Sequence, residues 1–222
     1  MYYSTDLYRQ LKDETGVDTG WREVGGIRLA SSPERMQDIK RMVGMARSFG
    51  MPMEVISPQE AHDLFPLMSM DGVVGAAYTP NDGVIDPTGL TNALAAGAKN
   101  RGATFFQDTD VQEIIVTNGQ VSEVVTNQGR IKTEIVVNAA GQWGGEVGKM
   151  VGLNLPVVPM AHLYIITKPI EGVGHKFPTL RDPDLLVYWR EEVGGLITGG
   201  YERDPAPFGL DGIPKDFKYQ LL

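Results

Sequence analysis

The stretch that decides the fold is residues 135–143, which read IVVNAAGQW. We expect a buried apolar strand that ends in small residues and leads directly into a helix, which begins after Gly141 and runs to about Val151. Small residues let a backbone approach a ligand closely, and a helix N-terminus favours negative groups such as a pyrophosphate. The alternative interpretation is a tight strand-to-helix turn packed against a neighbouring segment.

Short strands are predicted immediately before this stretch. Asn118-Gly119 and Gln128-Gly129 are turn sequences that separate apolar runs, a pattern typical of a β-meander. The predicted strands cover residues 104–107, 111–117, 121–126 and 132–138.

Helix-initiating sequences recur in the first half of the chain. Ser32 followed by Pro33 predicts a helix that runs to about Phe49. Ser57 and Glu60 have the spacing of a capping box, which begins a shorter helix. Other segments predict helices over 3–15 and 88–100, and strands over 21–29, 53–56 and 72–78.

The last third of the chain predicts strands over 157–168, 185–190 and 195–201. On the first of these, His162 and Tyr164 would point to one face, because side chains alternate along a strand. A paired histidine and tyrosine can orient a substrate and manage a proton near neutral pH. The alternative interpretation is a half-buried structural strand, in which the polar ends of the two side chains form ordinary hydrogen bonds.

A second group of polar residues lies on the strand at 185–190. Tyr188 and Arg190 share a face, and an arginine beside a tyrosine can hold a carboxylate. Arg190 could equally pair with a nearby glutamate at the surface, at position 191, 192 or 202. Gly199-Gly200 on the next strand would let the backbone approach a flat ring, or would mark a bulge.

Composition narrows the function classes. The chain has 222 residues, 42% of them hydrophobic and 22% charged, with a net charge of -8, a pI of about 4.9 and no cysteine. The acidic balance excludes nucleic acid as an expected partner, and the lack of cysteine excludes disulfides and thiolate chemistry. Three scattered histidines predict no metal site, and no apolar run is long enough to span a membrane. The absence of a signal peptide predicts a cytoplasmic protein.

These elements together predict an α/β (α+β) fold with a largely antiparallel sheet flanked by helices. The chemistry they suggest becomes more definite when the short motifs are considered in order. The motifs are Gly25-Gly26, Val55-Ile56-Ser57-Pro58 with Glu60-Ala61, Tyr78-Thr79-Pro80 with Asp82-Gly83, Asp86-Pro87, Val137-Asn138-Ala139-Ala140-Gly141, Met160-Ala161-His162, Tyr188-Trp189-Arg190-Glu191 and Gly199-Gly200-Tyr201-Glu202.

In this order, the motifs resemble the FAD-dependent amine oxidoreductases of the D-amino-acid oxidase superfamily, and within it the dimethylglycine and sarcosine dehydrogenase or oxidase group. The resemblance implies that His162 and Tyr188 are catalytic and face the substrate near the flavin ring. Arg190 and Tyr164 are the expected substrate-binding residues. The positions that the resemblance places against FAD are Val111, Ala139, Ala140, Gly141, Trp143, Gly199 and Gly200.

The sequence also departs from this group, because the N-terminal glycine-rich fingerprint is absent. We therefore expect a fragment that is inactive alone, with FAD bound by the complete protein, since the missing segment supplies the pyrophosphate site. The expected substrate-binding domain comprises 21–75 and 152–202. The expected partial FAD-binding domain comprises 1–20, 76–151 and 203–222.

Two functions are compatible with this interpretation. In the first, the complete protein oxidises a secondary or tertiary amine such as dimethylglycine or sarcosine, and the flavin takes a hydride equivalent from the carbon next to nitrogen. In the second, the chain is a non-catalytic regulatory or interaction module of the same fold that does not bind FAD by itself. Surface exposed by the missing segment would favour homo-oligomers in that case.

Overall fold

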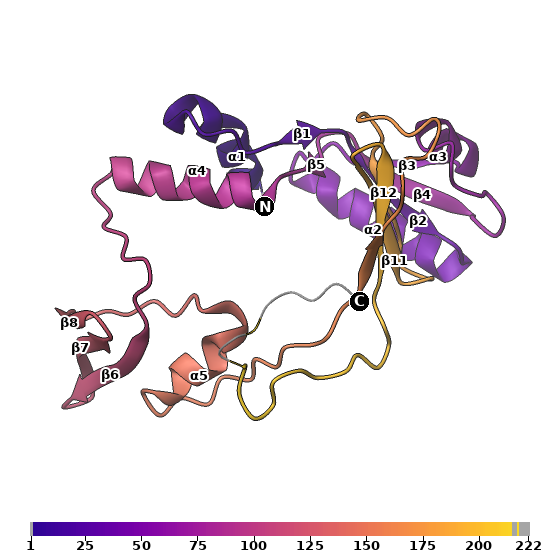
Figure 1. The fold of residues 1–222 in the computed structure, drawn as a ribbon. Helices are drawn as coiled ribbons and strands as arrows, with labels where there is room; N and C mark the ends of the chain where they lie inside the picture. The colour runs from indigo at the N-terminus through magenta and orange to yellow at the C-terminus, as the bar shows by residue number, and fades with distance from the viewer. Residues whose placement is uncertain (1, 215–216, 218–222) are drawn as a thin grey trace. The chain divides into compact units, whose positions relative to one another are not determined.

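The computed structural model describes residues 2–214 and 217. The chain divides into two compact units. We call Met1–Ala103 with His162–Arg203 the sheet unit, and Thr104–Ala161 with Asp204–Leu222 the meander unit. Each unit is therefore discontinuous in sequence, and the meander unit is built largely from a segment inserted between two halves of the sheet unit (Figure 1).

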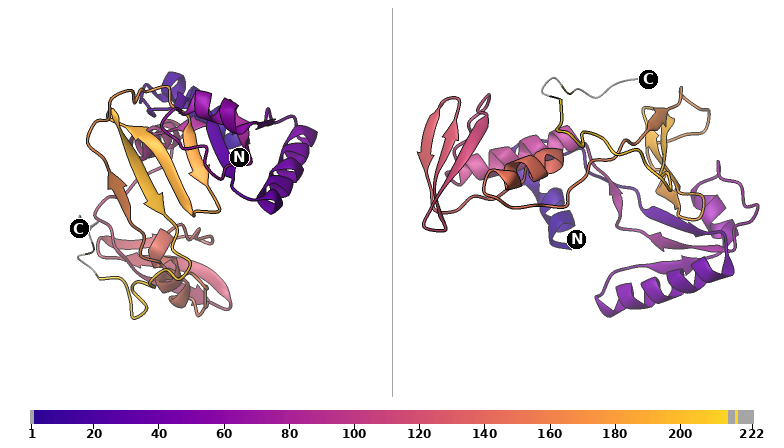
Figure 2. Two further views of the ribbon diagram at one scale, coloured as in Figure 1. Left: turned by 90° about the vertical axis from the view of Figure 1, so that its right-hand side faces the viewer. Right: turned by 90° about the horizontal axis from the view of Figure 1, so that it is seen from below.

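A seven-stranded sheet forms the centre of the sheet unit, in the order β3-β4-β2-β10-β11-β12-β9. Neighbouring strands are antiparallel except for β2 and β10, which pair in parallel. The strands lie side by side in the left view of Figure 2. They are β2 (Gly26–Ala30), β3 (Glu54–Ile56), β4 (Gly75–Thr79), β9 (Tyr164–Ile166), β10 (Thr179–Asp182), β11 (Val187–Glu192) and β12 (Gly195–Gly200).

The helices of the sheet unit begin where the sequence predicted. The Ser32 side chain accepts a hydrogen bond from the Arg35 amide, and Ser57 and Glu60 form both bonds of a capping box. Asp86 caps a further helix through the amides of Thr88 and Gly89. The helices are α1 (Tyr2–Thr15), α2 (Pro33–Ser48), α3 (Pro58–Leu64) and α4 (Pro87–Asn100), and β1 (Arg22–Glu23) pairs with β5 (Gly83–Val84).

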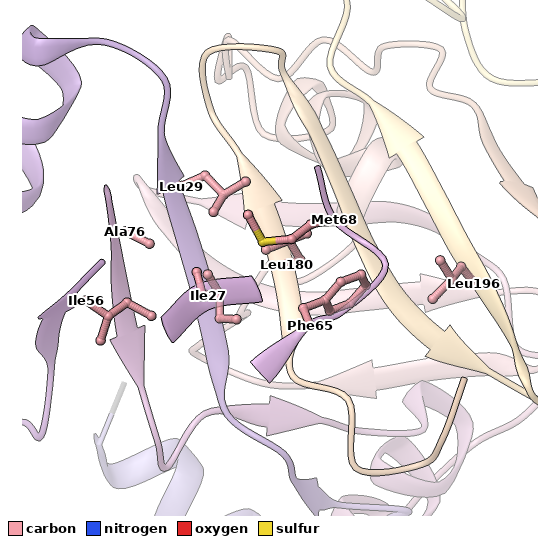
Figure 3. Packing of buried hydrophobic residues seen from close by; sticks show 9 residues of the cluster. Ile27, Leu29, Ile56, Phe65, Met68, Ala76, Leu180 and Leu196 are labelled. Atoms are coloured by element: carbon pink, nitrogen blue, oxygen red, sulfur yellow. The ribbon is translucent and has the colours of Figure 1, made fainter. Parts of the chain in front are cut away.

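The two faces of the sheet bury different clusters because side chains alternate along each strand. Ile27, Leu29 and Leu180 point to one face, where they pack with Phe65 and Met68, which lie at the end of α3 and just beyond it (Figure 3). Ala30 and Ala77 point to the other face and pack with Ile39 and Val43 of α2. Helix α2 covers this second face over β2 and β4. The part of the face over β10 and β11 is left open.

The meander unit contains a three-stranded antiparallel sheet in the order β6-β7-β8, as the turn sequences predicted, although the third strand covers 129–132 and not 132–138. Asn118 and Gly119 both have positive φ, of 53° and 78°, which a tight hairpin turn requires. A short helical segment follows. The elements are β6 (Val111–Thr117), β7 (Gln120–Thr126), β8 (Gly129–Lys132), η1 (Gly141–Trp143) and α5 (Gly144–Lys149).

The expected buried strand at 132–138 is wrong. Strand β8 ends at Lys132, and the Ile135 and Val137 side chains beyond it are 78% and 83% exposed. Within the described residues no strand pairs with residues 134–138, so this part of the segment has no ladder of hydrogen bonds to join. Residues 104–107 are likewise not a strand, for the same reason.

In the last third of the chain, the observed strands differ from the predicted ones. Of the strand expected over 157–168, only Tyr164–Ile166 forms, so His162 lies just before β9 rather than on it. Strand β10 was missed, because Arg181 and Asp182 make its four residues atypical of a strand. Asp182 is nevertheless 3% exposed, and its carboxylate accepts the amides of Asp184 and Leu185 in the following turn.

Candidate functional site

The open part of the second sheet face forms a hollow of about 530 Å³ within the sheet unit. It lies over the central strands, between the side chains that point away from the main core. Polar and aromatic groups face it from three neighbouring strands and from the residue after β12. The residues that matter for the chemistry are Arg28 on β2, Arg181 on β10, Tyr188 and Arg190 on β11, and Tyr201.

Three aromatic rings form a group, of which Tyr188 and Tyr201 line this hollow and His162 stacks beside Tyr201. The ring centroids of His162 and Tyr201 are 4.8 Å apart, and those of Tyr188 and Tyr201 are 5.7 Å apart. His162 and Tyr188 are separated by 6.5 Å between centroids, with nearly parallel rings. The Nδ1 atom of His162 also lies 3.5 Å from Oε2 of Glu202. The structure therefore brings His162 and Tyr188 together, with Tyr201 beside both rings.

Strand pairing explains how Tyr188 is positioned. Tyr188 on β11 lies directly opposite Gly199 on β12, which in turn lies opposite Tyr164 on β9. A side chain at Gly199 would meet the Tyr188 ring, with the phenol oxygen 2.5 Å from the added Cβ. The glycine therefore lets the Tyr188 ring lie flat across the neighbouring strand.

The environment of Tyr188 keeps its phenol protonated. Burial raises the pKa of Tyr188, and the nearby Tyr201 raises it further, whereas Arg190 opposes the shift. The phenol is therefore a hydrogen-bond donor at neutral pH, since its pKa already begins near 10. This suits a group that positions a substrate or donates a hydrogen bond to it.

The two expected substrate-binding residues differ in their surroundings. Arg190 lines the hollow, but its guanidinium donates to Oε2 of Glu192 at 2.5 Å, as the surface-pair interpretation predicted. Tyr164 lies on the edge strand β9 and is 57% exposed. Gly200 lies at the end of β12, and a Cβ built there would have only the Leu186 carbonyl oxygen near it, at 3.8 Å.

The remaining cofactor-facing positions lie in the meander unit. Val111 begins β6, while Ala139, Ala140 and Gly141 form the turn before α5. The Ala140 amide donates to Oδ1 of Asn138, which also ties the turn to the Gly144 carbonyl oxygen through its Nδ2 atom. Gly141 has φ of +55°, and a Cβ there would meet no atom within 4 Å.

The turn at residues 139–141 is compatible with contact by a flat or extended cofactor such as FAD. Its side chains extend no further than Cβ, and the space beside Gly141 is open. Trp143, which follows directly, is 41% exposed and contacts Phe217 edge-on at a centroid distance of 6.3 Å. In the described part of the chain, metal-ligating side chains do not gather in groups of three.

Three residues of the hollow were missed by sequence reasoning: Tyr201, Arg28 and Arg181. Tyr201 lies two residues after Gly199, just beyond the end of β12, so the alternation of side chains along this strand could have placed it near Tyr188. Arg28 interrupts the apolar run of β2, and an arginine at an inward position of a half-buried strand is itself a signal. Arg181 could not be found, because β10 itself was not predicted.

Comparison with known proteins identifies the class to which this fold and hollow belong. The family model described as "FAD dependent oxidoreductase" (DAO) matches residues 1–222, so the chain belongs to this family. Its sheet, helices and meander match the fold of these flavoproteins. The solved structure of L-proline dehydrogenase from P. horikoshii superposes with a TM-score of 0.80 and 29% sequence identity over 92% of this chain and 55% of that one.

Individual relatives refine this placement. Sarcosine dehydrogenase of Homo sapiens is 40% identical over 89% of this chain, and dimethylglycine dehydrogenase of Rattus norvegicus is 36% identical over 100% of it. The pyruvate dehydrogenase phosphatase regulatory subunit of Mus musculus is 36% identical over 95% of the chain. All three names carry the word mitochondrial. The chain spans 22%, 27% and 24% of the lengths of these relatives, respectively.

Proposed function

We propose that this chain forms the substrate-facing sheet and part of the cofactor-binding region of an enzyme that oxidises a secondary or tertiary amine, such as sarcosine or dimethylglycine. The single observation that carries the proposal is the grouping of His162, Tyr188 and Tyr201 beside the hollow. The similarity to sarcosine and dimethylglycine dehydrogenases supports the choice of N-methylated glycines as substrates.

His162 is the group that we assign to the amine proton. Only a neutral amine has the nitrogen lone pair from which hydride loss at the adjacent carbon can be driven, so the ammonium form must first lose a proton. The imidazole can act as the base that accepts this proton, and Oε2 of Glu202, 3.5 Å from Nδ1 of His162, stabilises the resulting cation. The Tyr188 phenol, which stays protonated, orients the substrate through a hydrogen bond.

The chemistry that FAD supplies when bound is the acceptance of a hydride equivalent. The residues of this chain that we assign to its binding are Val111, Ala139, Ala140, Gly141, Trp143, Gly199 and Gly200. We also propose that residues 21–75 and 152–202 serve the substrate, and that 1–20, 76–151 and 203–222 serve the cofactor. This division follows function, and it runs along different boundaries from those of the two compact units.

The test is the substitution His162→Gln in the complete protein, with His62→Gln as the matched control. His62 lies on α3, where its Nδ1 atom is 3.1 Å from the Met68 carbonyl oxygen, and its neighbours Ala61 and Phe65 pack in the core on the opposite face of the sheet from Tyr188. We expect turnover of dimethylglycine to fall on the order of 10²-fold in the first variant and less than twofold in the control. A His162→Gln enzyme that keeps the wild-type rate and pH profile contradicts the role.

A second function is favoured by the similarity to a phosphatase regulatory subunit. In this alternative the chain belongs to a non-catalytic module that binds a partner and turns over no amine. Flavin absorbance near 450 nm in the purified complete protein, together with its bleaching by dimethylglycine, separates the two functions. A colourless protein that forms dimers supports the regulatory alternative, and a yellow protein bleached by the amine supports the enzyme.

Localisation remains a separate proposal. Of the helices in the described part of the chain, none combines the length and apolar character that a membrane span requires. The sequence predicted the cytoplasm, whereas the relatives named above are mitochondrial proteins. We retain the cytoplasmic location as a proposal, which fractionation of cells that express the complete protein tests directly.

A further inference from the structure

One row of side chains crosses the open face of the sheet. Arg28 on β2 pairs in register with Arg181 on β10, and Arg181 pairs in register with Tyr188 on β11. Residues in register on adjacent strands point to the same face and lie about 4.8 Å apart. Two guanidinium groups and a phenol therefore stand side by side in the hollow, and all three residues line it.

The four arginines of the hollow differ in how their charge is balanced. Arg9 pairs with Asp6 and Glu23, and Arg190 pairs with Glu192. In the part of the chain that the structure describes, no carboxylate pairs with Arg28 or Arg181. Asp82 is the acid that lines the hollow, and its Oδ1 atom accepts the Gly83 amide.

The contacts of Arg28 and Arg181 leave their hydrogen-bonding capacity largely unused. The Nη1 atom of Arg28 lies 3.9 Å from the thioether sulfur of Met42, which is a weak acceptor. The Arg181 guanidinium lies over the Tyr201 ring, 5.0 Å from its centroid, which fixes its plane and leaves its N–H edge open. Burial lowers the pKa of Arg28, and the positive charges of Arg181 and Arg35 lower it further.

Two unbalanced cations in one hollow are unfavourable unless an anion joins them. The whole chain carries a net charge of -8, so this cationic hollow is opposite in sign to the molecule around it. Guanidinium groups match carboxylates especially well, because each can donate two parallel hydrogen bonds. A carboxylate between Arg28 and Arg181 would use their free donors and remove the repulsion between them.

We propose that Arg28 and Arg181, rather than Arg190, bind the carboxylate of the amine substrate. This inference rests on the proposed amine oxidation. Tyr188 is the next residue in the row after Arg181, so a substrate that contacts Tyr188 can direct its carboxylate towards the two guanidinium groups. The site therefore selects amines that carry a carboxylate over amines that carry none.

The test compares two amines that differ in the carboxylate. The variants Arg28→Gln and Arg181→Gln are assayed in the complete protein with dimethylglycine and with trimethylamine, which has no carboxylate. We expect kcat/KM for dimethylglycine to fall on the order of 10²-fold, mainly through KM, and kcat/KM for trimethylamine to change less than threefold. Arg41→Gln on α2, whose side chain is 75% exposed, is the matched control and leaves both values unchanged.

Direct binding of acetate separates this inference from the amine oxidation itself. We expect calorimetry to detect acetate binding to the wild-type protein and to Arg41→Gln, with loss of binding in Arg28→Gln and Arg181→Gln. If the wild type oxidises neither amine but shows this pattern with acetate, the proposed function fails and the carboxylate site stands. Equal acetate binding by all variants, or equal loss of rate with both amines, overturns the carboxylate site. Matching circular dichroism spectra and melting temperatures establish that each variant is folded.

Discussion

Similar apolar sequences are buried in the sheet unit and exposed in the meander unit. Ile27 on β2 is 2% exposed and lies between two paired strands, whereas Ile135 in the meander unit is 78% exposed and lies beyond the last paired strand. Both residues belong to short apolar runs that predict strands. The comparison teaches that such a run becomes a buried strand only where neighbouring strands accept its hydrogen bonds and a helix covers its side chains.

The sharpest test of this comparison is the same substitution in both units. We expect Ile27→Ala to lower the free energy of unfolding of the sheet unit by about 2–5 kcal/mol, because it leaves a cavity in the main core. Ile135→Ala should change stability by less than about 0.5 kcal/mol. Urea unfolding followed by tryptophan fluorescence measures the cost at Ile27 in a Trp143→Phe background, where Trp21 and Trp189 of the sheet unit remain. The cost at Ile135 is measured in a Trp21→Phe, Trp189→Phe background, where Trp143 of the meander unit remains. Equal costs at the two positions would break the comparison.

A smaller effect is expected at a buried carboxylate that holds the sheet unit together. Glu191 is 3% exposed and lies 2.8 Å from Nη1 of Arg22 and 3.1 Å from Nδ1 of His175, while it accepts the Gly194 amide at 3.0 Å. We expect Glu191→Gln to cost about 2–3 kcal/mol, since it leaves Arg22 without its counter-charge. Urea unfolding measures the cost, and the adjacent Glu192→Gln serves as the control.

The control is matched in chemistry but differs in burial. Glu192 pairs with Arg190 near the surface, with a side chain 32% exposed, so Glu192→Gln should cost less than about 1 kcal/mol. If both substitutions cost the same, burial does not set the strength of these ion pairs.

The Glu191 network also predicts a dependence of stability on pH. Burial alone would raise the pKa of Glu191, but hydrogen bonds from Gly194, Arg22 and His175 lower it below its ordinary value of 4.5. A carboxyl group whose pKa is lower in the folded state contributes stability above its ordinary pKa and loses that contribution as the pH falls through the folded value. The wild type should therefore lose stability below about pH 4.5 more steeply than Glu191→Gln.

The smallest expected effect concerns a helix cap. Ser57→Ala removes the capping box of α3 and should cost about 1 kcal/mol in the sheet unit. Ser48→Ala, at the exposed end of α2, removes only a bond to the Met45 carbonyl oxygen and should cost less than about 0.5 kcal/mol. Hydrogen exchange of the α3 amides measures the local effect. Unchanged protection in Ser57→Ala would show that tertiary packing alone holds this helix.

Local sequence signals predicted much of the fold. Helix α2 begins at Ser32, α3 at its capping box and α4 at Asp86, because each of these signals acts within four residues of the chain. The meander was predicted for the same reason, since its turns are defined by Asn118-Gly119 and Gln128-Gly129. Strand β10 was missed, because Arg181 and Asp182 are atypical of a strand and one of its two partners, β2, lies far away in the sequence.

The distinction between local signals and contacts with distant parts of the chain also explains which features of the candidate site could be predicted from the sequence. Tyr188 and Arg190 were placed on one face by the alternation of a single strand, which is a local rule. The pairing of Arg190 with Glu192 was anticipated among alternatives, but sequence could not choose between them. The adjacency of Arg28 and Arg181 depends on the register of two strands that are far apart in sequence, so no local pattern contains it.

The parallel pairing of β2 with β10 has a consequence for synthesis of the protein. Strand β2, which begins at Gly26, can pair with β10 only after Thr179 and the residues that follow it have been synthesised. Strand β4, which pairs with the other edge of β2, is synthesised much earlier. At usual rates of translation this interval is on the order of ten seconds. During that time an apolar strand edge of the nascent chain remains open to pairing with other chains. Co-translational chaperones therefore have a defined segment of this protein to protect, and the need ends when residues 179–182 leave the ribosome.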